Sequence, residues 1–174
     1  GSINVAAGKT FTVQGVVSNN GVLTVNGAGT LVLNGAATNG NNAANTGDNT
    51  AISNGATLMT QAAGGTPFGD ANVTINGGTL RVNTGGPSAT FIIPTLNYAG
   101  GAYIAHNQIA GADTQITATT LARVGAGTLT LVPSAEGGIG NTANSDLRIL
   151  SGTALGQSTA TVQGLATLNN YGVG

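Results

Sequence analysis

Short runs of alternating apolar and small polar residues recur along the chain. In Val73-Thr74-Ile75 and Leu129-Thr130-Leu131 the apolar side chains are two positions apart, which is the spacing of a strand with one buried face. Turns containing Asn-Gly, Gly-Gly or Ser-Gly separate these runs. The pattern predicts strands at Thr10–Val13, Val22–Val25, Thr30–Leu33, Thr57–Met59, Val73–Ile75, Thr79–Val82, Phe91–Ile93, Leu121–Val124, Thr128–Leu131, Leu147–Leu150 and Ala160–Val162. No sustained helical spacing accompanies them, so the sequence predicts an all-β fold.

Two motifs occur twice in the same order. The run Gly27–Leu33 reads GAGTLVL, and Gly125–Leu131 reads GAGTLTL. A second motif follows each of these, over Gly65–Gly77 and then over Gly152–Gly164. Ordered repetition of this kind is typical of architectures that stack one supersecondary unit on the next.

The spacing between the two motifs is longer in the first half of the chain. The polar stretch Ala36–Asp48 has no strand character and accounts for the difference as a loop inserted into one repeat. We therefore expect residues 1–174 to form a single solenoid domain with two imperfect repeats, at about 20–98 and 118–174.

Two all-β architectures are compatible with this pattern, a parallel β-helix or β-solenoid and a tandem antiparallel β-sandwich. Repeated short motifs favour the solenoid, because each stacked coil meets the same environment as its neighbour. Aromatic residues are only 3% of the chain and glycine occupies 30 positions. Small side chains suit a narrow solenoid interior and glycines suit its tight corners.

The runs Gly27–Ala36, Asn54–Leu58 and Gly69–Leu80 resemble the autotransporter-associated β-strand repeat. The first copy covers about Leu23–Val82, and a weaker second copy covers Leu121–Leu168. The resemblance implies a right-handed β-helix in the secreted passenger region of a large bacterial surface protein. It places the chain outside the cell, at the bacterial surface, and implies no activity.

The segment Pro94–Thr120 does not fit the repeat. It contains Tyr98, Tyr103 and the only histidine, His106. We expect its Tyr98–His106 region to be a binding loop, since loops that interrupt coils often carry binding sites.

Charged residues make up only 5% of the chain, and the net charge is -1. The fixed cations are Lys9, Arg81, Arg123 and Arg148, which are too scattered for the basic cluster that nucleic acid or an anionic membrane surface requires. No apolar run is long enough for a transmembrane helix, so we expect no membrane insertion. A net charge near zero favours association between copies.

The sequence offers little for catalysis or for metal and cofactor binding. The acidic residues are Asp48, Asp70, Asp113, Glu136 and Asp146, and all of them fall in or beside expected turns. His106 has no second histidine or cysteine as a partner. We expect no enzyme activity, no metal and no cofactor. A solenoid hydrolase or lyase is the least favoured function, because it would need clustered ionisable groups.

Two functions remain. The first is structural: a rigid extracellular element that assembles end to end with itself as a filament, or forms part of a longer stalk. Ile3, Val5, Tyr171 and Val173 mark its uncapped ends. The alternative is an adhesin segment that binds a glycan or host surface through inserted loops. Its candidate residues are Asn41, Asn42 and Asp48 in one loop, and Tyr98, Tyr103 and His106 in the other.

Overall fold

A computed structural model describes residues 1–14, 17, 21–33, 49–61, 65–68, 72–84, 89–108, 114–132 and 147–151, with 83, 84, 89, 106–108, 114 and 147–151 described by their backbone alone. Every regular element in these ranges is a strand. The strands are β1 (Ser2–Asn4), β2 (Thr10–Val13), β3 (Val22–Asn26), β4 (Thr30–Leu33), β5 (Asn49–Ser53), β6 (Thr57–Thr60), β7 (Asn72–Asn76), β8 (Thr79–Thr84), β9 (Ala89–Gln108), β10 (Thr114–Val132) and β11 (Leu147–Ser151).

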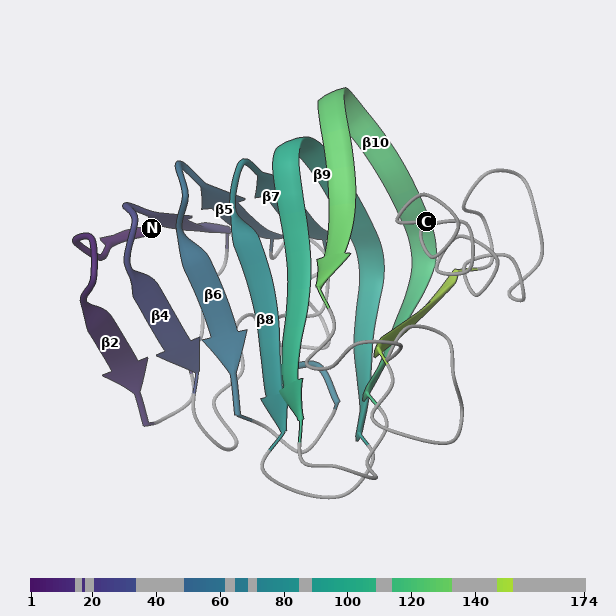
Figure 1. Cartoon of the computed structure of the whole chain (residues 1–174), viewed down its shortest axis with the longest axis horizontal. Coiled ribbons are helices and arrows are strands. Elements are labelled where there is room, and N and C mark those ends of the chain that lie inside the picture. Colours follow the sequence, from purple (N-terminus) through teal and green to yellow (C-terminus); the bar gives the residue numbers. More distant parts are fainter. Residues whose placement is uncertain are drawn as a thin grey trace.

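The strands coil around one axis as a parallel β-solenoid. Strands β1, β3, β5 and β7 pair in parallel along a first wall, and β2, β4, β6 and β8 pair in parallel along a second wall. Coils run from β1 and β2 at one end of the molecule to β10 at the other, and they turn right-handed (Figure 1). The predicted solenoid is confirmed. The sandwich is wrong, because every strand pair in the described residues is parallel.

Strands β9 and β10 each wrap around more than one wall. Residues 95–99 of β9 extend the first wall beside β7, and residues 103–108 extend the second wall beside β8. Strand β10 follows β9 on both walls. A third wall is formed by the beginning of β9, the beginning of β10 and β11, which also pair in parallel.

The core is built from columns of side chains that stack in register along the axis. On the second wall, one column contains Leu31, Leu58, Leu80 and Ile104, all fully buried. Each residue of a column repeats the environment of the one before, so similar volumes recur at equivalent positions. Burying an aliphatic side chain of this size contributes about 1.5–3 kcal/mol, so these columns are the main source of the solenoid's stability.

The corner between the first and second walls is tight. A Cβ on Gly78 would lie 2.7 Å from Cγ2 of Ile52 and 2.9 Å from the carbonyl oxygen of Ala56. These distances are shorter than a side chain tolerates, so the coil can pass this close to its neighbour only with glycine here. The Gly77-Gly78 turn noted in the sequence is therefore a corner of the coil.

The expectation that Tyr98–His106, within the segment Pro94–Thr120, forms a loop is wrong. Residues 94–108 lie within β9 and residues 114–120 lie within β10, in register with the neighbouring coils. Pro94 falls between the third-wall and first-wall parts of β9. The segment differs from the repeat in sequence, but it places side chains in the same columns, and column position is what stacking requires.

Candidate functional site

The first described coil has an edge with which no described strand pairs. Strands β1 and β2 stand at the two ends of the strand order, and each pairs on one side only, β1 with β3 and β2 with β4. Within the part of the chain that the structure describes, no strand pairs with their other edges. An unpaired edge presents backbone N–H and C=O groups that can pair with a further strand. In Figure 1 this edge lies at the purple end of the molecule.

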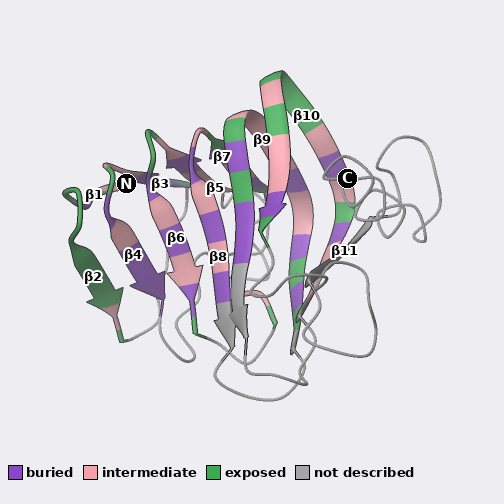
Figure 2. Ribbon diagram, in the orientation of Figure 1, coloured by how far each residue is buried: buried purple, intermediate pink, exposed green. Residues whose placement is uncertain are grey.

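The inner column of the second wall ends in an exposed aromatic ring. Phe11 of β2 is the register partner of Leu31 of β4, so its side chain continues the column of core leucines. Leu31 is fully buried, whereas Phe11 is 52% exposed. Figure 2 shows the same contrast, with β2 mostly exposed and the strands after it carrying buried positions. The first coil thus presents an apolar surface along the axis, beside unpaired strand edges.

The predicted end residues take different positions. Ile3 lies in the edge strand β1, partly buried and in register with Val25. Val5 is 5% exposed and belongs to the core. Its carbonyl oxygen accepts a hydrogen bond of 3.0 Å from the N–H of Gly29. Val5 therefore closes a corner of the first coil and is not part of the exposed end. Tyr171 and Val173 lie outside the described residues.

The residues predicted to mark the ends of the solenoid did not include Phe11. The signal available in the sequence is the run Thr10–Val13, whose alternation matches that of Thr30–Leu33. That match assigns Phe11 to an inner column, but only the structure shows that no described coil covers it.

The prediction that the second candidate binding region is a loop is wrong. Tyr98, Tyr103 and His106 all lie in strand β9. Tyr98 follows Ile75 on the first wall and is partly buried against the core. Tyr103 follows Thr79 on the second wall and is 45% exposed, and His106 is the register partner of Val82. The strand register fixes their positions, because each one continues a row begun by earlier coils. The loop containing Asn41, Asn42 and Asp48 lies outside the described residues.

The described side chains carry little charge. They include the cations Lys9, Arg81 and Arg123, whereas all five acidic residues fall outside the described ranges. In these ranges no three His, Cys, Asp or Glu residues gather as a possible metal site. The described portion also contains no helix long and apolar enough to cross a membrane. The described surface offers backbone pairing, apolar contact, hydrogen bonding by hydroxyl and amide groups, and the cations Lys9 and Arg123, which are exposed.

Comparison with protein-family models, with curated proteins and with solved structures gives no match. The resemblance to the autotransporter repeat stays a prediction, and the functional argument depends on the geometry of the coils.

Proposed function

We propose that this chain is a structural solenoid of the bacterial cell surface, which extends by stacking coil on coil at the open edge of β1 and β2. Copies joined head to tail in this way form a filament. In a longer stalk, another coil would stack on the same edge of β1 and β2. The observation that carries the proposal is the exposure of Phe11, at 52%, in a column whose next member, Leu31, is fully buried.

The energetics favour coverage of this edge by another coil. Burial of a phenylalanine side chain contributes about 1.5–3 kcal/mol when it is complete. Each backbone hydrogen bond formed with β1 or β2 adds a net contribution of about 0.5–1.5 kcal/mol. A parallel strand fits best, because β1 and β2 already pair in parallel with β3 and β4.

The described residues of β10 supply a matching edge in a second copy. On the first and second walls, β10 pairs with β9, and within the described ranges its only other pairing is with β11 on the third wall. Leu131 of β10 belongs to the same column as Leu31 and is 7% exposed. In a head-to-tail pair, Phe11 of one copy would follow Leu131 of the other. With a net charge of -1, the chain opposes this contact only weakly through charge repulsion.

Sedimentation velocity over a range of protein concentrations tests the proposal. The unmodified chain is expected to form larger species as concentration rises. Phe11→Asp is expected to abolish them, because a charge would be buried between the two coils. Thr12→Asp is the matched control, since it adds the same charge in the same strand on the opposite, outward face. A single species at every concentration for the unmodified chain would reject head-to-tail assembly, and so would equal effects of the two variants.

A further inference from the structure

The outward surface of the second wall carries a continuous row of hydroxyl-bearing side chains. Successive register partners place Thr10, Thr30, Thr57, Thr79, Tyr103 and Thr130 at one position of consecutive coils. Neighbouring members are separated by the distance between paired strands, about 4.8 Å. The row is the reverse face of the leucine column, because strand side chains alternate between the two faces.

Tyr103 is the one aromatic member of this row. Its side chain is 45% exposed, and it stands between Thr79 on one coil and Thr130 on the next. Its ring carbon Cε2 lies 3.9 Å from the point that a Cβ on Gly101 would occupy. The ring therefore extends toward the glycine corner, where no side chain from Gly101 competes for the space beside it.

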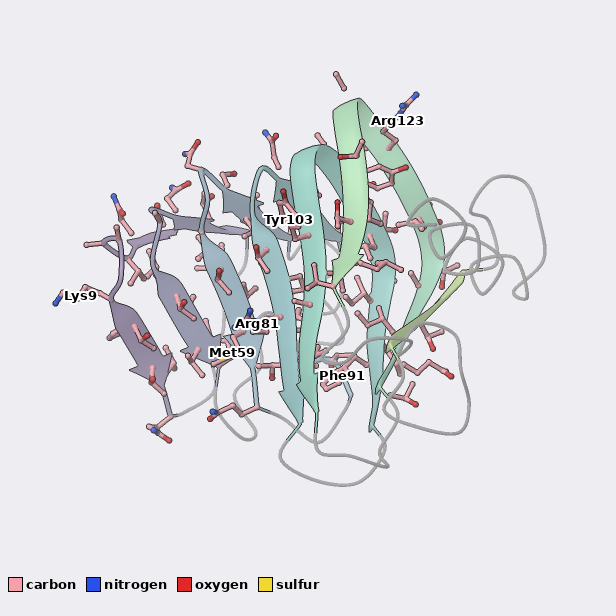
Figure 3. All side chains as sticks on the ribbon, in the orientation of Figure 1. Lys9, Met59, Arg81, Phe91, Tyr103 and Arg123 are labelled. Atoms are coloured by element: carbon pink, nitrogen blue, oxygen red, sulfur yellow. The ribbon has the colours of Figure 1, made fainter. Side chains whose placement is uncertain are left out.

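Hydroxyl groups flank the ring on more than one side. Thr128, which is exposed, is the register partner of Gly101, and Thr130 is the register partner of Tyr103. Threonine and tyrosine hydroxyls both donate and accept hydrogen bonds. Among the described side chains, the charged one nearest along this wall is Arg81, two residues beyond Thr79 in β8. Figure 3 labels Arg81 and Tyr103 on this wall and Arg123 on the upper edge.

We propose that Tyr103, Thr79, Thr128 and Thr130 form a binding site for a neutral glycan. One pyranose ring stacks its C–H face on the Tyr103 ring, whose face carries partial negative charge. The threonine hydroxyls, about 4.8 Å away on each neighbouring strand, bond to hydroxyls of the sugar. The chain of sugars continues along the threonine row toward Thr57 and Thr30, parallel to the solenoid axis. A neutral sugar fits because none of these four residues supplies a cation for a carboxylate or sulfate group.

Isothermal titration with neutral hexasaccharides of glucose, mannose and galactose tests this site, with hexagalacturonate as the anionic comparison. We expect at least one neutral hexasaccharide to bind in the micromolar to millimolar range and the anionic one to bind more weakly. Tyr103→Ala should weaken binding about tenfold or more. Tyr103→Phe should keep most of the affinity, because the stacking face remains. Thr130→Val should weaken binding by a smaller factor.

Tyr98→Phe is the matched control, because Tyr98 lies in the same strand but packs against the core. Circular dichroism confirms that each variant keeps its strand content. Absence of binding by all neutral hexasaccharides at millimolar concentration overturns the proposal. Stronger binding of hexagalacturonate also overturns it, as does equal binding by Tyr103→Ala and the unmodified chain. The outcome is independent of head-to-tail assembly, because Phe11→Asp removes the assembly contact and leaves this wall intact.

Discussion

Phe11 and Leu31 are register partners in one inner column, and their exposures are opposite. Leu31 is fully buried because a coil lies on each side of it, whereas Phe11 is 52% exposed at the open edge of β2. The two positions are equivalent in the fold, but Leu31 has a described strand on each side and Phe11 has one on one side only. This contrast locates the surface at which the solenoid can continue.

The difference between the two residues predicts a difference in stability. Leu31→Ala should lower the free energy of unfolding by about 2–5 kcal/mol, because it leaves a cavity in the packed column. Phe11→Ala should cost less than about 1 kcal/mol in dilute solution, because the ring is already half in water. Urea denaturation at low protein concentration measures both values. Equal losses would mean that Phe11 is covered in solution.

Hydrogen exchange should distinguish the edge strands from the interior. Amides in β1 and β2 are expected to exchange faster than those in β4 and β6, because the edge strands have one pairing partner instead of two. Raising the protein concentration should slow exchange in β1 and β2 selectively, as their free edges pair with another copy. Protection of β2 that matches β4 at every concentration would contradict the open edge. Mass spectrometry of peptides from 2–13 and 30–33 provides the measurement.

The corner glycines provide a matched pair of substitutions. Gly78→Ala should destabilise the fold by about 1–3 kcal/mol, because its Cβ would meet Ile52 and Ala56 at less than 3.0 Å. Gly101→Ala should be neutral or slightly stabilising, because its Cβ would meet only Tyr103, at 3.9 Å. Thermal denaturation compares the two variants. A Gly78→Ala variant as stable as Gly101→Ala would show that the coils are less closely packed at this corner.

Asn54 has a left-handed backbone conformation, with φ of 57°, in the turn between β5 and β6. Its Nδ2 donates a hydrogen bond of 3.5 Å to Oδ1 of Asn26 on the preceding coil. Asn54→Ala should lower the free energy of unfolding by about 1–2 kcal/mol, because alanine is strained in this conformation. Asn54→Gly should be close to the unmodified chain. Urea denaturation that ranks alanine equal to or above glycine would contradict the left-handed turn.

Much of the fold could be predicted from the sequence, because the apolar residues that alternate along each strand are the ones that stack in the inner columns. The predicted strand Thr30–Leu33 has the bounds of β4, and Thr10–Val13 has those of β2. Strand β5 was missed because a threonine, Thr50, occupies one of its inner positions. The structure accommodates Thr50 through a hydrogen bond of 2.8 Å from its hydroxyl to the carbonyl oxygen of Phe68. The sequence does not reveal such a contact between distant residues.

Register is the part of the site that the sequence could not supply. By motif, Thr128 matches Thr30, but the strand pairing places Thr130 at the equivalent position. The pairing of β9 and β10 shifts between Arg123 and Gly127. Such a bulge adds residues to one strand, so residues that match by motif no longer occupy equivalent positions in the coils. The sequence also could not show which threonines flank Tyr103, because they come from neighbouring coils.

Electron microscopy of the purified chain at several concentrations tests the central claim most directly. The account predicts filaments with an axial repeat of at least about 30 Å per copy, from six first-wall strands about 4.8 Å apart. It also predicts that Phe11→Asp yields only short separate particles while Thr12→Asp still forms filaments. Short separate particles of the unmodified chain at every concentration would contradict it, as would filaments that persist in Phe11→Asp.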